Sequence, residues 1–322
     1  MKVHWAGLVG DVGGTHARFA LVDAQGHVRH PKTYRARDND TLNDVLSDYI
    51  NTVAGRSRPP RAAIAVAGPV LDGEMEFTNL HWRISDVEIL SHFEFEAVRL
   101  LNDFAAQALA CPYLDADDLR TLGPGLRAVH DCPVVVMGAG TGFGVAALAR
   151  SARGDVAIAT EGGHAGFAPG DEVEAELWSR ARLRHGRVSI ERLLCGQGLF
   201  EIYGDLCAMD QTPAIHADEQ AVMTAGLTGE PMASATLDRF GAILGSVAGD
   251  LALSFGARGG VFISGGIAPR MADRLAAGPF RERFEAKGRM SEYVRAIPTS
   301  LVVHPYPALV GAARELAQME RL

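Results

Sequence analysis

The first part of the chain alternates short apolar runs with a glycine turn. Leu8-Val9 and the run from Phe19 to Val22 flank the turn "GDVGGT", and Ala17, Phe19 and Leu21 recur with a period of two. Successive side chains of a strand point to opposite faces, so this spacing puts the three side chains on one face. We therefore predict a β-hairpin around the first glycine turn.

Two further apolar runs are typical of buried strands. The run "AAIAVA", Ala62 to Ala67, ends at Gly68-Pro69, and the run from Val98 to Leu101 ends at Asn102-Asp103. Between these runs, the segment "SDVEIL" has serine and glutamate at the spacing of a capping box, Ser85 and Glu88, which predicts the start of a helix. Strands and helices alternate, which indicates an α/β fold.

A second glycine turn repeats the arrangement of the first. The segment "VVVMGAGTGFGVAAL", from Val134 to Leu148, aligns with the first turn so that Gly140 falls on Gly14 and Thr141 on Thr15. Both segments consist of an apolar run, a glycine turn with a threonine, and a second apolar run. Such a repeat indicates a duplicated domain with one ligand held between the copies, and a chance match is the alternative.

The C-terminal part continues with helical and strand-like patterns. Apolar residues have helical spacing from Leu237 to Phe255, and the strand-like "GGVFISGG" follows from Gly259 to Gly266. The tail from Ala308 to Glu320 is typical of a helix. Because terminal helices commonly dock on an earlier element, we expect this one to return to the first lobe.

Length and charge narrow the class of protein. At roughly 150 residues per domain, a chain of 322 residues favours two lobes. With 48% hydrophobic and 22% charged residues, the composition is that of a globular protein. The net charge of -8 opposes a broad surface for nucleic acid or anionic membranes, because the phosphates of either would be repelled.

The cysteines and the apolar runs favour a cytoplasmic protein. None of Cys111, Cys132, Cys195 and Cys207 forms a C-x-x-C pair, so we expect buried, reduced thiols rather than zinc or disulfides. The N-terminus lacks a basic segment followed by an apolar core. The longest uncharged run is glycine-rich and shorter than the ~20 residues of a membrane span. We expect no membrane partner and no nucleic acid.

The glycine turns are candidates for phosphate binding, because the missing Cβ atoms let backbone N–H groups approach the oxygens. A Walker A loop needs a lysine after its last glycine, and Lys2, Lys32 and Lys287 all lie elsewhere. The spacing G-x-G-x-x-G is also missing at both turns. These two phosphate-binding classes are therefore excluded.

A carboxylate in the first turn fits a different phosphate chemistry. Gly13, Gly14 and Thr15 can donate hydrogen bonds to terminal phosphates, while Asp11 orients a hydrated Mg²⁺ ion. The alternative is an ordinary hairpin in which Asp11 stabilises its own turn.

Motifs along nearly the whole chain resemble those of bacterial glucokinases, in the hexokinase, Hsp70 and actin superfamily. They are "GDVGGTHAR", "TNLHW", "LLNDFAAQALA", "GAGTGFGVA", "EGGHAGFAP", "ERLLCGQGL", "VFISGGIAPR" and "HPYPALVGAA". The resemblance implies a two-lobed, actin-like ATPase fold of the ribonuclease H-like type, with duplicated α/β domains and a cleft between them. It places a small α/β domain at residues 1–111 plus 304–322 and a large one at 112–303.

The resemblance also implies ATP as phosphoryl donor and Mg²⁺ as cofactor, with Asp11 holding the metal through water. The residues implied at the nucleotide are Gly10, Asp11, Val12, Gly13, Gly14 and Thr15 for the first phosphate segment, Gly140, Thr141 and Gly142 for the second, and Gly265 and Gly266 near adenosine. The alternative for the last pair is that it ends a strand and lets the chain turn tightly.

A free sugar presents hydroxyls that donate and accept, so its site needs converging carboxylates, amides and often a histidine. The resemblance assigns glucose binding to Asn102, Asp103, Glu161, His164 and Glu191, with Asp103 as the catalytic base. Local sequence alone favours Asp103 as a helix N-cap instead. For Glu191, a residue that complements a helix dipole is an equal alternative.

The implied activity is glucokinase: transfer of a phosphoryl group from ATP to the 6-hydroxyl of D-glucose, giving glucose 6-phosphate and ADP, the first step of glycolysis. Relatives are often homodimers, so a homodimer is expected. The alternatives are a related hexokinase with another preferred sugar and a non-catalytic sugar-sensing protein. Polyphosphate as donor also stays open.

The chain departs from the family pattern at two places. It has His16 where asparagine is common, and Gly68-Pro69 where a cysteine often precedes the proline. The histidine at position 16 leaves open how the first phosphate turn is supported. The neighbouring ROK sugar kinases have a cysteine-rich zinc motif after the catalytic region, whereas this chain has "HAGFAPGDEVEAEL" there, so structural zinc is not expected.

Overall fold

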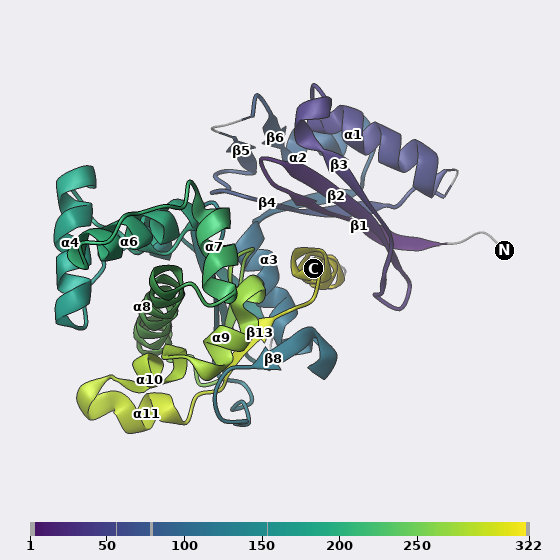
Figure 1. Cartoon of the computed structure of the whole chain (residues 1–322). Coiled ribbons are helices and arrows are strands. Elements are labelled where there is room, and N and C mark those ends of the chain that lie inside the picture. The colour runs from purple at the N-terminus through teal and green to yellow at the C-terminus, as the bar shows by residue number, and fades with distance from the viewer. Residues whose placement is uncertain (1–3, 56, 78–79, 153, 320–322) are drawn as a thin grey trace. The chain divides into compact units, whose positions relative to one another are not determined.

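The computed structural model describes residues 4–55, 57–77, 80–152 and 154–319, which form two compact units (Figure 1). Unit 1 comprises residues 1–114, 153–159 and 304–322, and unit 2 comprises residues 115–152 and 160–303. Thr78 and Asn79 of the "TNLHW" motif lie outside the described residues.

Unit 1 is built on a five-stranded sheet with the order β3-β2-β1-β4-β7. β1 pairs antiparallel with β2 and parallel with β4, and β4 pairs parallel with β7. The predicted hairpin around the first glycine turn is therefore confirmed. The strands are β1 (Trp5–Val12), β2 (His16–Asp23), β3 (Val28–Arg35), β4 (Arg61–Val66) and β7 (Ala97–Asn102), with a separate pair β5 (Glu74–Glu76) and β6 (Arg83–Ser85). The helices are α1 (Leu42–Tyr49), α2 (Asp86–Phe93), α3 (Asp103–Ala110) and α12 (Pro307–Met319).

The apolar side chains of β2 alternate between the two faces of this sheet, as the period of two predicts. Ala17, Phe19 and Leu21 lie in one core cluster, together with residues of α1 and α2. Ala20 and Val22 belong to a second cluster, with residues of α12. Each face is thus covered by helices, which buries the central strands on both sides.

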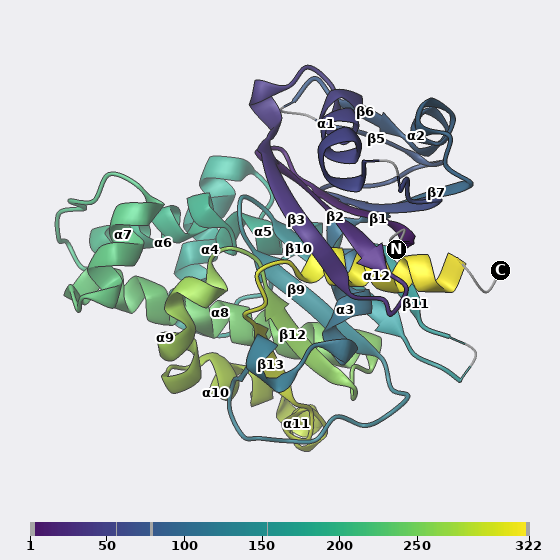
Figure 2. The ribbon, with the colours of Figure 1, turned by 90° about the vertical axis from the view of Figure 1, so that its right-hand side faces the viewer.

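The helix expected at the C-terminus is α12, which packs against α3, β1 and β4 of unit 1 (Figure 2). A Cβ atom on Gly311 would lie 1.6 Å from the carbonyl oxygen of Ala106 in α3. Only glycine permits the two helices to approach this closely.

The capping box predicted at Ser85 and Glu88 is wrong, although helix α2 does begin at Asp86. The Ser85 side chain makes no capping hydrogen bond. Ser85 is the last residue of β6 and is buried. Glu88 lies instead 3.8 Å from the Arg83 guanidinium.

The second sheet repeats the strand pattern of the first. It has the order β11-β10-β9-β12-β13-β8, in which β9 pairs antiparallel with β10 and parallel with β12, and β12 pairs parallel with β13. Its strands belong to unit 2, except that all but the last residue of β11 lie in the segment 153–159 of unit 1. The first five strands thus correspond to β3-β2-β1-β4-β7, which supports the predicted duplication over a chance match. The strands are β8 (Leu119–Thr121), β9 (Val134–Ala139), β10 (Phe143–Ala149), β11 (Val156–Thr160), β12 (Gly260–Ser264) and β13 (Thr299–Val302).

The long helix α8 (Pro231–Phe255) organises the helical part of unit 2. It packs against α6, α7 and α10 (Figure 1). The helix begins earlier than the predicted Leu237, because Pro231 occupies its first turn and the Glu230 carboxylate caps it. The other helices are α4 (Glu172–His185), α5 (Ile190–Leu193), α6 (Gly196–Met209), α7 (Glu219–Leu227), α9 (Ala272–Ala277), α10 (Phe280–Glu285) and α11 (Ser291–Arg295).

The cysteines are free thiols, as expected. Cys111, Cys195 and Cys207 are buried, whereas Cys132 is only half-buried. Burial raises the pKa of the Cys111 thiol. Within the described part of the chain, no helix combines the length and apolar character that crossing a membrane requires.

Candidate active site

The first glycine turn is closed by backbone hydrogen bonds. The Gly13 N–H donates to the His16 carbonyl over 2.9 Å, and the Thr15 carbonyl accepts from the Ala36 N–H over 3.0 Å. Gly14 and Thr15 are exposed, and a Cβ atom on Gly14 would meet no atom within 4 Å. Since His16 contributes its backbone to the closure, the histidine in place of asparagine leaves this turn intact.

Asp11 lies on β1 directly before this turn. Its carboxylate accepts a hydrogen bond from the Arg18 guanidinium over 3.1 Å, across the hairpin, and is one-fifth exposed. Burial raises the pKa of the Asp11 carboxyl above its ordinary value, and the positive charge of Arg18 offsets only part of that rise. The carboxylate is therefore partly dehydrated and already has a cationic neighbour.

The described residues contain no group of three or more His, Cys, Asp and Glu side chains that would hold a metal ion. A single carboxylate is nevertheless enough for Mg²⁺ that arrives with nucleotide phosphates, because this ion keeps most of its waters. Asp11 therefore fits a Mg²⁺ ion held through water and phosphate oxygens.

Asn102 is the last residue of β7, and Asp103 follows it at the same edge of the unit 1 sheet. Val12 is in register with Val66, and Val66 is in register with Asn102, so the turn after β1 and the start of α3 lie two strands apart. At a strand spacing of 4.7–4.9 Å, this is about 10 Å. The unit therefore collects a glycine turn, Asp11 and Asp103 along one sheet edge.

Asn102, and not Asp103, is the N-cap of α3, so the interpretation from local sequence is wrong. The Asn102 Oδ1 atom accepts from the Phe104 and Ala105 N–H groups, while its Nδ2 donates to the Gly68 carbonyl over 3.2 Å. Asp103 is the first helical residue, is half-buried, and accepts from the Phe104 N–H over 2.9 Å. Asn102 supplies a complete cap, so capping does not require the carboxylate of Asp103.

In unit 2, two chain segments pair and bring Glu161, His164 and Glu191 together. The loop after β11 contains Glu161 and the short helix Gly162–His164. It then pairs with the segment before α5: the Phe167 N–H donates to the Val188 carbonyl over 3.2 Å, and the Ile190 N–H to the Ala165 carbonyl over 2.9 Å. Glu191 follows in the first turn of α5.

The His164 imidazole lies between the two carboxylates. Its Nε2 atom is 4.0 Å from Glu161 Oε2, and its Nδ1 atom is 3.9 Å from Glu191 Oε1. The Glu161 and His164 side chains are about 60% exposed, and that of Glu191 is 30% exposed. These three groups offer donors and acceptors on one accessible surface, as binding of a polyhydroxylated ligand requires.

The second glycine turn, between β9 and β10, contacts the same surface. The Gly140 N–H donates to the Gly142 carbonyl over 2.8 Å, and the Phe143 N–H donates to Glu191 Oε2 over 2.8 Å. The sequence predicted the turn and the glutamate separately. Their contact joins residues that are 48 positions apart, so no local pattern indicates it.

Gly265 and Gly266 follow β12, which is the parallel neighbour of β9. A Cβ atom on Gly265 would lie 2.4 Å from the Ala139 carbonyl, and its φ of +84° favours glycine. Gly265 therefore has a packing role in this turn. Gly266 is exposed with no atom within 4 Å of a Cβ, so only this glycine leaves space at the sheet edge.

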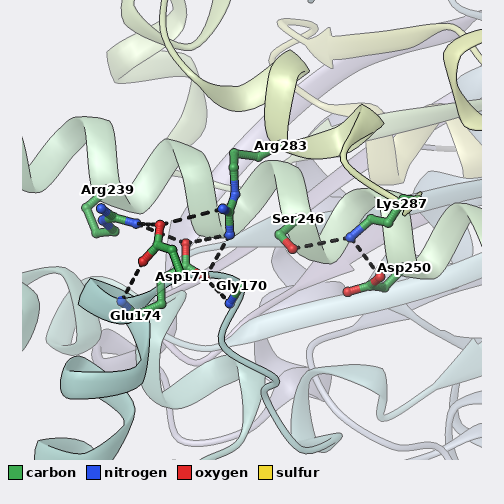
Figure 3. Close-up of polar contacts among 8 residues, drawn as sticks. All are labelled: Gly170, Asp171, Glu174, Arg239, Ser246, Asp250, Arg283 and Lys287. Atoms are coloured by element: carbon green, nitrogen blue, oxygen red, sulfur yellow. Dashed lines mark hydrogen bonds and ion pairs between the residues drawn. The ribbon is translucent and has the colours of Figure 1, made fainter. Parts of the chain in front are cut away.

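A buried charge cluster lies at the far end of the loop between β11 and α4, residues 161–171, which we call the sugar-site loop (Figure 3). Glu174 is completely buried and accepts from the Gly170 N–H over 2.7 Å. The Arg283 guanidinium donates to both of its oxygens over 2.8 and 2.9 Å, and Arg239 donates over 3.2 Å. Asp171, which caps α4, accepts from Arg239 as well. Sequence analysis missed this cluster, since its members come from α4, α8 and α10.

Comparisons with known proteins agree with this geometry. A sequence model of the family described as Glucokinase matches residues 8–319. A glucokinase of Caulobacter vibrioides is 46% identical over 312 residues, 95% of this chain and 94% of the relative. A glucokinase of Chromobacterium violaceum is 44% identical over 314 residues, 97% of this chain and 90% of the relative.

Among solved structures, the glucokinase from an Antarctic psychrotroph is similar to this chain with a TM-score of 0.89. The two chains are 40% identical, and the match covers 97% of this chain and 98% of that one. The likeness confirms the predicted α/β fold.

Proposed function

This chain belongs to the glucokinase family, and on that basis we propose that it transfers the γ-phosphoryl group of ATP to the 6-hydroxyl of D-glucose. The products are glucose 6-phosphate and ADP. The observation that carries the proposal for this chain is the placement of His164 between the carboxylates of Glu161 and Glu191, next to a glycine turn. A sugar site and a phosphate turn in one unit are what sugar phosphorylation needs.

Glucose binding is assigned to Glu161, His164 and Glu191 of unit 2 and to Asn102 and Asp103 of unit 1. Carboxylates accept from sugar hydroxyls, and the imidazole donates or accepts according to its tautomer. The Asn102 amide donates one hydrogen to the Gly68 carbonyl, and we assign its second hydrogen to a sugar hydroxyl. Such a site discriminates against analogues that lack a hydroxyl, because a carboxylate or the imidazole would lose its partner in the complex.

Asp103 acts as the general base. Its carboxylate accepts the proton of the 6-hydroxyl while that oxygen forms its bond to the γ-phosphorus. The bond from this phosphorus to the β–γ bridging oxygen breaks, and ADP leaves with the bridging oxygen. The N-terminal end of α3 favours an ionised carboxylate at this position, because helix N-termini carry partial positive charge.

The glycine turns bind the phosphates of the donor. The exposed Gly14 and Thr15 in unit 1 and the turn Gly140 to Gly142 in unit 2 present backbone to the oxygens, and Gly266 leaves space assigned to adenosine. Asp11 would hold Mg²⁺ through water, and the ion would supply charge neutralisation at the phosphoryl group.

A coupled assay for ADP tests the proposal. We expect ADP release from ATP and Mg²⁺ that depends on glucose and exceeds that with fructose, mannose or N-acetylglucosamine. Faster turnover of another hexose would show that this hexose, and not glucose, is the preferred substrate. Tight glucose binding without sugar-dependent ADP would identify a sugar sensor. The same panel, run with ADP and with polyphosphate in place of ATP, identifies the phosphoryl donor.

The proposed setting is the cytoplasm, where ATP is available and free thiols such as Cys111 and Cys195 stay reduced. We also propose a homodimer on the basis of family resemblance. Sedimentation equilibrium tests this assembly: a mass of twice the 34.3 kDa chain is expected, and a single-chain mass would overturn it.

A further inference from the structure

We propose that Glu191 couples the sugar site to the nucleotide turn of unit 2, so that occupation of one changes the affinity of the other through this one carboxylate. The inference rests on the proposed function, because it takes glucose and a nucleotide as the two ligands. It goes beyond that function by assigning a second task to a sugar-binding residue.

The two oxygens of Glu191 face different partners. Oε1 lies 3.9 Å from the His164 imidazole, on the sugar side. Oε2 accepts a hydrogen bond of 2.8 Å from the N–H of Phe143, the first residue after the turn. A carboxylate is a rigid planar group, so a ligand that moves or reorients one oxygen also moves the other.

Because residue 142 is a glycine, the Glu191 carboxylate can approach the turn closely. A Cβ atom on Gly142 would lie only 2.5 Å from Glu191 Oε2, so no side chain separates the carboxylate from the turn. At Gly140, by contrast, a Cβ atom would meet nothing within 4 Å. The two glycines of one turn therefore differ in a way that an experiment can use.

The residues around Glu191 hold the backbone that carries this carboxylate in place. Leu193 and Leu194 are buried in the core of unit 2, and Ile190 is tied to the Ala165 carbonyl. Further along the same segment, the Gly196 N–H donates to the Gly140 carbonyl over 3.0 Å. The segment from Glu191 to Gly196 thus contacts the turn at two points, while its first residue contacts His164.

By linkage, any coupling between two sites is reciprocal in binding free energy, and couplings of about 5- to 150-fold are typical. If Glu191 carries the coupling, a change confined to the turn alters glucose affinity even when no nucleotide is present. A change at Glu191 also removes the effect of glucose on nucleotide affinity. The second effect separates coupling from a simple loss of one ligand contact.

The first experiment compares Gly142→Ala with Gly140→Ala, using isothermal titration calorimetry with glucose alone. The methyl group at residue 142 displaces the Glu191 carboxylate, so we expect glucose affinity to fall by about fivefold or more. In Gly140→Ala we expect a change of less than about twofold, because its methyl group has open space. Equal glucose affinities in the two variants, both with unchanged melting temperature, would overturn the inference.

The second experiment measures the affinity for AMPPNP with and without saturating glucose in Glu191→Ala and Glu161→Ala. Both variants lose a carboxylate beside His164, but of the two only Glu191 accepts a hydrogen bond from the Phe143 N–H. We expect glucose to change AMPPNP affinity in the unchanged protein and in Glu161→Ala, and to have less than twofold effect in Glu191→Ala. The same factor in all three proteins would overturn the coupling while leaving the proposed function intact. Failure of the unchanged protein to bind glucose would instead overturn the function itself.

Discussion

At the scale of single residues, neighbouring side chains at the start of α3 have separate tasks. Asn102 caps the helix through Oδ1, whereas Asp103 is the proposed base. In Asp103→Asn we expect turnover to fall by about 10²- to 10⁴-fold, with glucose binding still measurable and the melting temperature nearly unchanged. The coupled ADP assay and a thermal melt check both parts. Full turnover in this variant would exclude Asp103 as the base.

Asn102→Ala tests the helix cap instead. It removes the cap and should lower the free energy of unfolding by about 1 kcal/mol. The sequence placed the Asn-Asp pair correctly at the junction of a strand and a helix. It did not identify which of the two caps the helix, because both residue types are good caps and only the backbone geometry distinguishes them.

Asp23, at the end of β2, gives the stability of unit 1 a dependence on acid pH. Although burial raises its pKa, hydrogen bonds from the backbone N–H groups of His27 and Gln25 and from Arg29 lower it from 3.8 to about 2. The folded state therefore binds fewer protons than the unfolded state between these values, so this stabilisation is present above about pH 4 and is lost towards pH 2. Asp23→Asn should flatten the change of unfolding free energy with pH over that window. Urea titrations at several pH values measure the slope, and an unchanged slope would contradict this account.

At the scale of elements, the buried charge cluster fixes α4 and the end of the sugar-site loop against α8 and α10 (Figure 3). Glu174→Gln removes the buried carboxylate and leaves Arg239 and Arg283 with the partly exposed carboxylate of Asp171. Breaking a buried ion pair on one side typically costs about 3–5 kcal/mol of unfolding free energy. We expect a loss of this size in chemical denaturation, together with weaker glucose binding.

Glu292→Gln serves as the control for the charge cluster, because it removes an ion pair with Arg295 in which the glutamate is 84% exposed. A change below about 1 kcal/mol is expected there. Equal losses in the two variants would show that burial gives the Glu174 cluster no special importance.

The elements differ in how far the sequence predicted them. The hairpin β1–β2 was predictable because its alternating side chains are set by the geometry of one strand. Contacts such as Glu174 with Arg283, 109 positions apart, depend on how α4 and α10 pack against α8. The start of α2 at Asp86 was predictable from the segment "SDVEIL", but the local pattern did not fix the hydrogen bonds of the Ser85 side chain, which makes no cap bond.

At the scale of the whole molecule, the repeated strand order assigns one glycine turn to each unit. The sequence indicated this duplication from two turns alone. It was detectable because each turn follows an apolar strand and precedes its antiparallel partner. The matching order of the remaining strands was not predictable, since the sequences that connect them differ in length and in helical content.

The proposed reaction draws sugar-binding residues from both units, and hydrogen exchange can test this directly. We expect glucose to slow amide exchange at residues 161–167 and 187–191 of unit 2 and at residues 102–105 of unit 1, because ligand contacts suppress local opening. Helix α11, Ser291–Arg295, carries no proposed ligand contact and serves as the internal reference. Mass spectrometry of peptic fragments measures each segment separately. Slower exchange confined to unit 2 would exclude Asn102 and Asp103 from the sugar site, and with them the proposed base. The placement of His164 between two carboxylates would then remain as the basis of sugar binding.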